Sequence, residues 1–582
     1  MARPDDSPIP ESPIRRKYLK CLGAGGVMML AGCTGGGDGG DSEDGEQTTT
    51  QTDDGGDDTQ TETTTAAGGL VEGGHLRVTA ISPPASLNPF KGTSQGDCVF
   101  FEMMYDRLTS YNRDYEVIPN LATDWEPNEN ADAWTFDLNP DATFPQLGQA
   151  VLGEDVEATV EVMQSEDVVP GAAVDLGPVA SENPVVVEDD HRVTINLSRS
   201  DAFFPARLGE TCSYFNIAPK NVIESRFEEM DTTDFGSGPF QLTSFEADNE
   251  YVFEANPDWY LSDAEGRQLP YVDKVTVTII PDTVAQANAL TGQRVDTINN
   301  LEQSIRSRIE NAGSASVHQY DTSSFLNMVL TTNLELENGD RPFADVRVRQ
   351  AMKHALDREE ISQATDGTMT IGHHSPVAPV YPGYAPFDEG LEFGTTAQVD
   401  EAVALLDEAG YPDGLDLPTP IYETDFQARR GTAVQLFQQQ MSKAGIRFDI
   451  RHVSPDTWLS KYWNQDGVWY SSGYAARMEQ TTVPRLAMHT DAKWNSGRWS
   501  NEAYDAAYDT FSSTTDDQEF LDAFHEAQRL AHLEGAWIIF GFMDQQAAAN
   551  DYVTHYEPGP AVNRDFNYDA ALSPEAPEGP DA

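Results

Sequence analysis

Carboxylates dominate this chain to an extent that limits both its surroundings and its partners. Asp and Glu number 97 against 36 Lys and Arg in 582 residues, a formal net charge of −61. Such a surface stays hydrated where molar salt screens charge over about 3 Å, which favours a halophilic source over an acidic mesophilic secreted protein. Nucleic-acid binding is excluded, because affinity for phosphates needs clustered Lys and Arg. A hydrophobic fraction of 39% still allows a buried core.

Residues 1–32 predict an export signal rather than a folded element. Arg15 and Arg16 precede a weakly apolar run that is too short to cross a hydrocarbon core of about 30 Å. Paired arginines ahead of a Gly-diluted apolar segment resemble a twin-arginine signal, and the Leu-Ala-Gly-Cys run ending at Cys33 resembles a lipobox. The alternative is a chance match in a Gly-rich stretch. We expect Cys33 to carry a lipid that anchors the protein at the extracellular face of the cytoplasmic membrane.

Both ends of the predicted folded body are disordered in this interpretation. Residues 33–73 predict an acidic tether, because the stretch from Thr34 to Glu72 contains no Lys or Arg and too little apolar surface to offset its ordering entropy. Residues 571–582 predict a disordered tail. The body between them holds Cys98 and Cys212, which fit either one disulfide or two buried thiols.

The body has a mixed α/β pattern. Alternating apolar residues predict half-buried strands, and apolar residues at helical spacing predict helices with recognisable caps. A strand, a helix and a second strand in succession predict a parallel β-α-β crossover. The predicted strands are residues 134–138, 193–197, 275–279, 415–422 and 446–450, and the predicted helices follow Asp345 and cover 401–409 and 432–444.

Catalytic and metal-binding patterns are absent from the sequence of the body. His525 and His532 begin and end a segment that resembles a zinc-protease helix, but Arg529 occupies the place of the second histidine. His373 and His374 are adjacent, so their side chains diverge, and we expect them to be solvated. There is no nucleophile elbow, phosphate-binding loop or dinucleotide fingerprint. We therefore predict a protein that is not an enzyme and has no cofactor and no metal.

Aromatic residues are unusually dense in the last third of the body. Flat apolar faces mixed with polar groups on loops are typical of a ligand cleft, although about half of these residues are expected to be core. The residues are Trp458, Trp463, Trp469, Tyr470, Tyr474, Trp494 and Trp499.

Several segments, taken in order, carry a family resemblance. They are residues 117–125, 134–138, 153–156, Gly236–Phe240, Asn256–Tyr260 and, as the most specific, Pro342–Arg358. This order resembles the extracellular solute-binding proteins of the peptide/nickel class, family 5, that serve ABC importers, here as a haloarchaeal-type lipoprotein with a twin-arginine signal.

The resemblance implies an α/β, two-lobed periplasmic-binding-protein-like fold of class II, with an extra subdomain in the first lobe. Lobe I is expected at 74–110, 226–320 and 536–570, the extra subdomain at 111–225 and lobe II at 321–535. The implied function is capture of a peptide-like or related solute and delivery to ABC permease subunits by a monomer. The alternatives are a saccharide- or other non-peptide-binding member of the family, or a secreted hydrolase on this fold.

The resemblance also places candidate ligand contacts. Peptide binders of this class present an Asp to the ligand's ammonium group, and the matching position here is Arg477, which repels an ammonium and prefers a carboxylate or phosphate. Either Glu479 takes the place of that Asp, or the ligand is a blocked peptide, an acidic solute or a saccharide. The full set of expected contacts is Asn88, Gln95, Trp469, Tyr470, Tyr474, Arg477 and Glu479.

Overall fold

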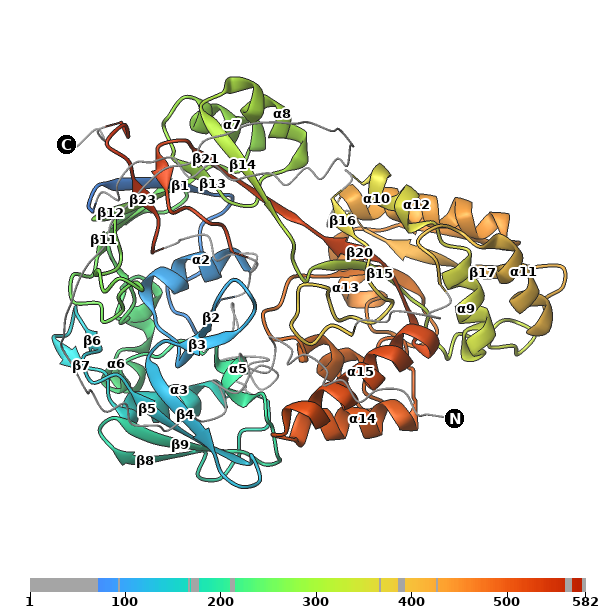
Figure 1. Ribbon diagram of the computed structural model, residues 1–582, viewed down its shortest axis with the longest axis horizontal. Helices are drawn as coiled ribbons and strands as arrows, with labels where there is room; N and C mark the ends of the chain where they lie inside the picture. Colours follow the sequence, from blue (N-terminus) through green and yellow to red (C-terminus); the bar gives the residue numbers. More distant parts are fainter. Residues whose placement is uncertain are drawn as a thin grey trace, which may run out of the picture.

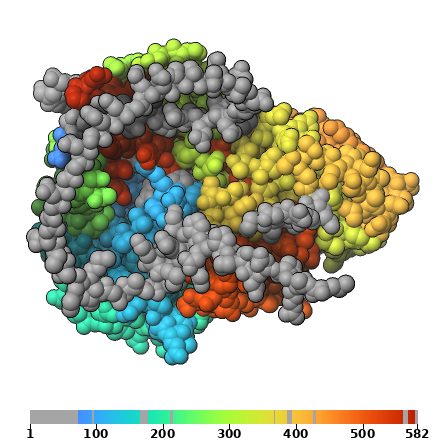
Figure 2. Space-filling view, in the orientation of Figure 1, coloured from blue at the N-terminus to red at the C-terminus, as the bar shows by residue number. Residues whose placement is uncertain are grey.

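The computed structural model describes residues 72–92, 95–165, 168, 177–209, 215–365, 368–385, 393–424, 428–559 and 568–577. They form two lobes and a subdomain attached to the first lobe (Figure 1). Figure 2 shows lobe II, in yellow and orange, projecting from the broader body that lobe I and the subdomain make together. The predicted signal, Cys33 and the tether up to residue 71 lie outside the described residues.

Lobe I contains two sheets. Strand β12, the strand predicted at 275–279, is confirmed, and its buried Val275 and Val277 belong to the largest core cluster. The first sheet has the order β1-β12-β11-β10 (His75–Ala80, Lys274–Ile279, Glu250–Ala255, Phe240–Glu246). The second has the order β13-β21-β14 (Thr297–Ile298, Gln545–Asn550, Ala315–Tyr320). The helices are α2 (Gln95–Met104), α7 (Thr283–Thr291) and α8 (Gln303–Ala312).

The extra subdomain is built on an antiparallel sheet of order β4-β5-β9-β8 (Ala122–Pro127, Ala133–Leu138, Arg192–Asn196, Val185–Asp189). Alternate residues Trp134, Phe136, Val193 and Ile195 are buried, as the period-two pattern predicted. Two hairpins, β2-β3 (Thr109–Tyr111, Val117–Pro119) and β6-β7 (Thr143–Phe144, Gln149–Ala150), accompany the helices α3 (Gly153–Met163), α5 (Phe204–Leu208) and α6 (Lys220–Ser225).

Lobe II has a six-stranded sheet of order β16-β20-β15-β19-β17-β18 (Met369–Thr370, Trp537–Met543, Phe325–Val329, Tyr470–Tyr474, Leu415–Glu423, Ile446–His452). Strands β17 and β18 are parallel and joined through α12, so the predicted crossover is confirmed. Asp345 caps α9 by accepting a hydrogen bond from the Arg347 N–H at 2.9 Å. The helices are α9 (Val346–His354), α10 (Arg358–Ala364), α11 (Val399–Glu408), α12 (Ala428–Lys443), α13 (Pro455–Lys461), α14 (Glu502–Ser513) and α15 (Asp517–Glu534).

Two strand crossings join the lobes (Figure 1). Strand β14 of lobe I continues through Asp321 towards β15 of lobe II, and β20 of lobe II continues through Asp544 into β21 of lobe I. The first crossing passes through Asp321. The second does not agree with the expected return at 536, because β20 is a fully buried strand that pairs with β15 in the sheet of lobe II. The chain returns to lobe I at Asp544.

The end of the folded body also differs from expectation. Ala571 and Leu572 form β23, which pairs with β22 (Val553–Thr554), and both are buried. The predicted tail from 571 is therefore ordered at its start, because these side chains complete an apolar contact. Cys98 is disulfide-bonded, and Cys212 lies outside the described residues. No helix in the described ranges is long and apolar enough to cross a membrane.

Three of the few positively charged side chains lie inside lobe II, where they donate hydrogen bonds to backbone carbonyls. The Arg349 guanidinium donates to the Glu534 carbonyl at the end of α15 at 2.6 and 2.9 Å, and to those of Phe343 and Ala344 at 2.8 and 3.1 Å. Lys353 donates to the His532 carbonyl at 2.6 Å and to that of Gly535 at 3.1 Å. Arg358 donates to the carbonyls of Gly372 and Gly394. Arg349 and Lys353 therefore satisfy carbonyls at the C-terminal end of α15.

Beside these cations lies a histidine cluster that the sequence placed wrongly. His374 is fully buried and His373 half-buried, because the segment that carries them packs under α15. The His374 ring stacks on that of His532 at 5.4 Å, and the His373 ring on that of Tyr384 at 4.4 Å. Burial and the neighbouring Arg358 lower the pKa of His373 to about 3. Desolvation, aided by Lys353 and neighbouring charges, lowers the pKa of His532 to about 2.

Replacement of Arg349 tests the carbonyl-capping role. Arg349→Met leaves the carbonyls of Phe343, Ala344 and Glu534, of which the first is buried, without this donor. An unsatisfied buried group costs about 1–3 kcal/mol, so we expect a loss of about 3 kcal/mol in the free energy of unfolding. Arg347→Met, in the same helix, removes a partly exposed ion pair with Asp345 and serves as the control, with a much smaller expected loss. Denaturant unfolding measures both, and equal losses would contradict the role.

The histidine cluster predicts a loss of stability in acid. The folded-state pKa of His373 lies below the unfolded value of about 6.5, so its contribution is complete above pH 6.5 and is lost as the pH falls towards 3. Asp106 and Asp234, whose pKa values burial raises to about 7, act in the opposite direction. We therefore expect His373→Phe to flatten the pH dependence by up to about 1.4 kcal/mol per pH unit between pH 6 and 4. Denaturant unfolding at each pH measures this, and unchanged slopes would show that His373 titrates normally.

Candidate functional site

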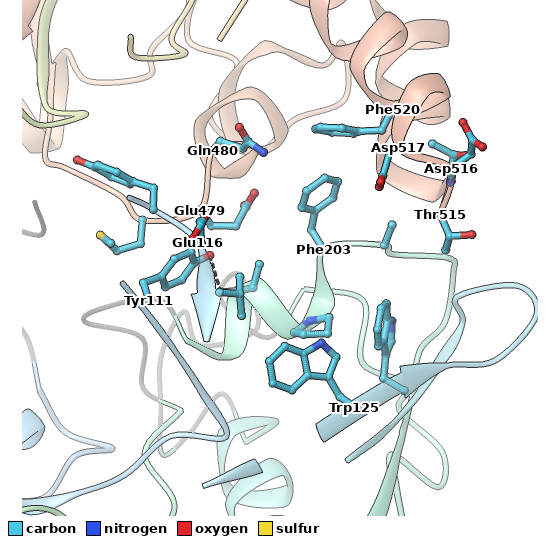
Figure 3. Close-up of a pocket in the computed structure, with 18 residues that line it drawn as sticks. Tyr111, Glu116, Trp125, Phe203, Glu479, Gln480, Thr515, Asp516, Asp517 and Phe520 are labelled. Carbon is cyan, nitrogen blue, oxygen red and sulfur yellow. Dashed lines mark hydrogen bonds between the residues drawn. The ribbon is translucent and has the colours of Figure 1, made fainter. Parts of the chain in front are cut away.

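A groove lies between the extra subdomain and lobe II (Figure 3). Its open volume is about 840 Å³, solvent at its mouth included. Aromatic side chains form much of its lining, and Figure 3 shows Trp125, Phe203 and Phe520 around the open space. The aromatic lining residues are Tyr111, Tyr115, Trp125, Trp134, Phe203 and Phe520.

The subdomain wall is held by hydrogen bonds at the polar edges of its rings. The Tyr111 hydroxyl donates to the Ala206 carbonyl at 2.9 Å, which joins β2 to α5. The indole N–H of Trp134 donates to the Asp201 carbonyl at 3.0 Å. Tyr115 has a positive φ of 61°, and its ring meets that of Tyr381 of lobe II edge-on at 5.1 Å. The wall is thus rigid and offers ring faces for apolar contact.

The wall of lobe II combines a loop with the start of α15. The Phe520 ring lies 4.9 Å from that of Phe203 across the groove. The polar lining residues are Glu116, Glu479, Gln480, Thr514, Thr515, Asp516 and Asp517, and no Lys or Arg is among the described residues that line the groove. The groove therefore offers ring faces for stacking together with hydrogen-bond acceptors, which suits a neutral or cationic organic solute.

The groove loop, residues 474–480, is fastened to the first crossing. The Ser324 hydroxyl donates to the Tyr474 carbonyl at 2.9 Å. The Ser323 hydroxyl oxygen accepts from the Arg477 N–H at 2.8 Å and donates to the Arg477 carbonyl at 2.7 Å. The Tyr381 hydroxyl donates to the same carbonyl at 2.7 Å. The groove loop is therefore held against the chain segment that connects β14 to β15.

Of the predicted contacts, Glu479 lines the groove. Its carboxylate is buried and accepts from the Thr481 N–H at 2.6 Å and the Thr482 hydroxyl at 2.7 Å. Arg477 is half-buried and lies two residues away on the same loop, without lining the groove. The Tyr474 ring stacks on Phe325 at 5.1 Å, beside this loop.

Asn88, Trp469 and Tyr470 do not line the groove. The Asn88 side chain is buried and bonds the Phe90 N–H at 3.0 Å and the Phe227 carbonyl at 3.2 Å. Trp469 is fully buried in a core cluster on the opposite face of the sheet from Tyr470, and its indole N–H donates to the Thr419 carbonyl. Tyr470 is fully buried too. Gln95 is the first residue of α2, and its side chain lies outside the described part.

Sequence reasoning did not find most of the groove. Tyr111 and Tyr115 flank a turn, and Phe203 and Phe520 lie more than 300 positions apart. The pair of tyrosines around the β2-β3 turn was the one local sequence pattern that could have indicated the groove. In the described part of the chain, no group of three or more His, Cys, Asp or Glu residues could hold a metal ion.

Known proteins resemble this chain over most of its length. Residues 116–518 match the model of the bacterial extracellular solute-binding proteins, family 5 Middle. Heme-binding protein A of Haemophilus influenzae is 23% identical over 505 residues, 81% of this chain and 86% of the relative. Oligopeptide-binding protein AppA of Bacillus subtilis is 25% identical over 409 residues, 66% of this chain and 69% of the relative.

Solved structures share the fold. HbpA2 from Haemophilus parasuis superposes with a TM-score of 0.72 at 21% identity, covering 86% of this chain and all of that one (100%). AppA from Bacillus subtilis, solved in complex with a nonapeptide, gives a TM-score of 0.65 at 20% identity, covering 87% of this chain and 100% of the other. The expected two-lobed α/β fold is confirmed.

Replacement of Ser323 tests how the groove loop is fastened. Ser323→Ala removes both hydrogen bonds to Arg477, so we expect faster amide exchange in residues 475–480, with a global loss of about 1–2 kcal/mol at most. Hydrogen–deuterium exchange resolved by peptide measures this. Ser454→Ala, which removes a helix cap away from the loop, is the control. Unchanged exchange in the loop would show that the hydrogen bonds from Ser324 and Tyr381 are enough to hold it.

Proposed function

The chain belongs to the bacterial extracellular solute-binding proteins of family 5, and from that premise we propose that it captures a small solute outside the cell for the permease of an ABC importer. The observation that carries this proposal is the aromatic groove between lobe II and the extra subdomain of lobe I, since two strand crossings join these two lobes. A groove shared between lobes can enclose a ligand when the lobes close. The protein acts by binding and release, without a catalytic step.

The ligand is proposed to be peptide-like. Relatives are named for binding oligopeptides, di- and tripeptides, heme and nickel, so family membership alone does not identify the class of ligand. The lining of the groove favours some of these classes over others. Six aromatic residues suit apolar side chains, and the acceptors at Glu479 and Gln480 suit amide or ammonium groups. A saccharide is the second candidate, because ring faces beside polar side chains also stack on sugars.

Glu479 is the predicted contact that the geometry supports best, and Tyr474 and Arg477 act through the groove loop in this proposal. Asn88, Gln95, Trp469 and Tyr470 stay predictions. Arg477 does not line the groove, so the argument for an acidic ligand rests on a residue outside it.

Delivery to a permease is proposed to take place at the membrane surface. Cys33 carries the lipid, and the tether of residues 33–73 lets the monomeric body reach the permease subunits. The twin-arginine signal and the halophilic setting belong to the same proposal, supported by the paired arginines and by the net charge of −61.

The test of the proposed function is mass spectrometry of what co-purifies with the mature protein. We expect the native mass to exceed the chain mass by one small organic molecule, which denaturation releases and which the protein binds again. Peptides with free amino termini would favour Glu479 as their partner, and oligosaccharides would favour the second candidate. Turnover of the released compound by the purified protein would contradict a binding role.

A further inference from the structure

A second cavity lies beside the β2-β3 hairpin and is distinct from the groove. It is bounded by α2 of lobe I, by the hairpin and by the chain near Tyr568, and its open volume is about 1150 Å³, solvent at its mouth included. Tyr111 lines both spaces, and its hydroxyl is bound to the Ala206 carbonyl at 2.9 Å, so it is a fixed part of both walls. We call this space the hairpin cavity.

The lining of the hairpin cavity carries charges of both signs. Among the described residues that line it, the guanidinium groups are those of Arg107 and Arg113, and the carboxylates are those of Glu102, Asp106, Asp114 and Asp569. The carboxylates are in excess, as they are in the whole chain. A ligand with a single charge would therefore leave part of this lining without a partner of opposite sign.

Arg107 is the buried cation of the cavity, and few acceptors surround it. Its side chain is 8% exposed. Its Nη2 atom donates to the Glu102 carboxylate at 3.3 Å, which is longer than the about 2.7–2.9 Å of a strong charge-assisted bond. Its Nε atom makes no hydrogen bond. Because a buried donor without an acceptor costs free energy, a ligand carboxylate that supplies two oxygen atoms would be favourable here.

Asp106 provides the opposite charge directly beside Arg107 in the chain. It is 2% exposed, and its carboxylate accepts from the Ser237 hydroxyl at 2.9 Å and from the Trp259 indole N–H at 3.4 Å. These donors are neutral, so they hold the carboxylate in place without cancelling its charge. Burial raises the pKa of Asp106 to about 7, and an ammonium group beside it would favour the charged form.

The remaining charges exclude simpler ligands. Arg113 is the more exposed cation, and it already donates to the Glu557 carbonyl at 2.9 Å and lies 3.8 Å from the Asp569 carboxylate. An inorganic anion at Arg107 would be repelled by the neighbouring carboxylates. A simple cation would leave the Arg107 donors without an acceptor. A molecule that carries both charges avoids both costs.

We infer that the hairpin cavity is a second binding site, for a small zwitterion of the amino-acid type, whose carboxylate binds Arg107 and whose ammonium group lies beside Asp106. The inference goes beyond the proposed function. The described residues that line the hairpin cavity come from lobe I and the extra subdomain, and none comes from lobe II. Binding here therefore does not require the two lobes to close on the ligand.

The test is isothermal titration calorimetry of the mature protein with glycine, acetate and methylammonium at constant ionic strength. Glycine carries both charges, whereas each of the other two compounds carries one of them at a matched size. We expect glycine to bind about tenfold more tightly than either, because only glycine makes both charge-assisted contacts.

A variant of Arg107 assigns the carboxylate contact. Arg107→Gln removes the cation and keeps a donor near Glu102, so we expect the affinity for glycine to fall about tenfold. Arg192→Gln removes a partly exposed ion pair between β9 and β5 of the same subdomain. It is the matched control and should leave the binding of glycine unchanged.

Hydrogen–deuterium exchange of the unmodified protein locates the bound glycine without any variant. Glycine should slow the exchange of residues 105–114, which form one side of the hairpin cavity, and leave the groove loop unchanged. If Arg107→Gln does not fold, this measurement and the comparison of the three compounds decide the question.

Absence of glycine binding would overturn the inference, and so would equal affinity for acetate or methylammonium. Unchanged affinity in a folded Arg107→Gln would overturn it as well. Slower exchange in the groove loop instead of residues 105–114 would place glycine in the groove and contradict a second site. The proposed function is judged by what co-purifies with the protein, so its failure and the failure of this inference are distinguishable.

Discussion

The arrangement of the two lobes depends on the two strand crossings at Asp321 and Asp544. Strands β14 and β21 pair in lobe I, and β15 and β20 pair in lobe II. The two sheets are therefore connected by two chain segments, one from each pair of strands. Two such segments allow bending while they keep the lobes in register. The groove loop is hydrogen-bonded to the first of them through Ser323 and Ser324.

The few positively charged side chains of this acidic protein include several that are buried. Arg349, Lys353 and Arg358 are buried in lobe II and bound by carbonyls, although carboxylates are plentiful in the chain. Arg207 is buried in the extra subdomain, where it is paired with Asp201. Most carboxylates remain at the surface, where they keep the protein hydrated. The few cations are thus informative because of where they lie, and the many anions carry little local information.

Patterns with a short period predicted their elements well. Strands β5, β9 and β12, the helix after Asp345 and the parallel pair β17 and β18 follow from alternation, capping and the crossover rule, all of which act over fewer than about 40 residues. Boundaries set by distant partners were less accurate. Strand β20 joined lobe II because β15 offers it a pairing edge, and His373 and His374 are covered by α15, whose position no local pattern reveals.

The sequence by itself determined the α/β class and the order of the family-like segments, because composition and local periodicity carry that information. Only the tertiary structure decided which aromatic residues face the groove. Trp469 and Tyr470 are neighbours that point to opposite faces of one sheet and are both buried, whereas Phe203 and Phe520 meet across the interface of two bodies. Side-chain direction depends on strand register and helix packing, and both are settled by contacts between residues far apart in the chain.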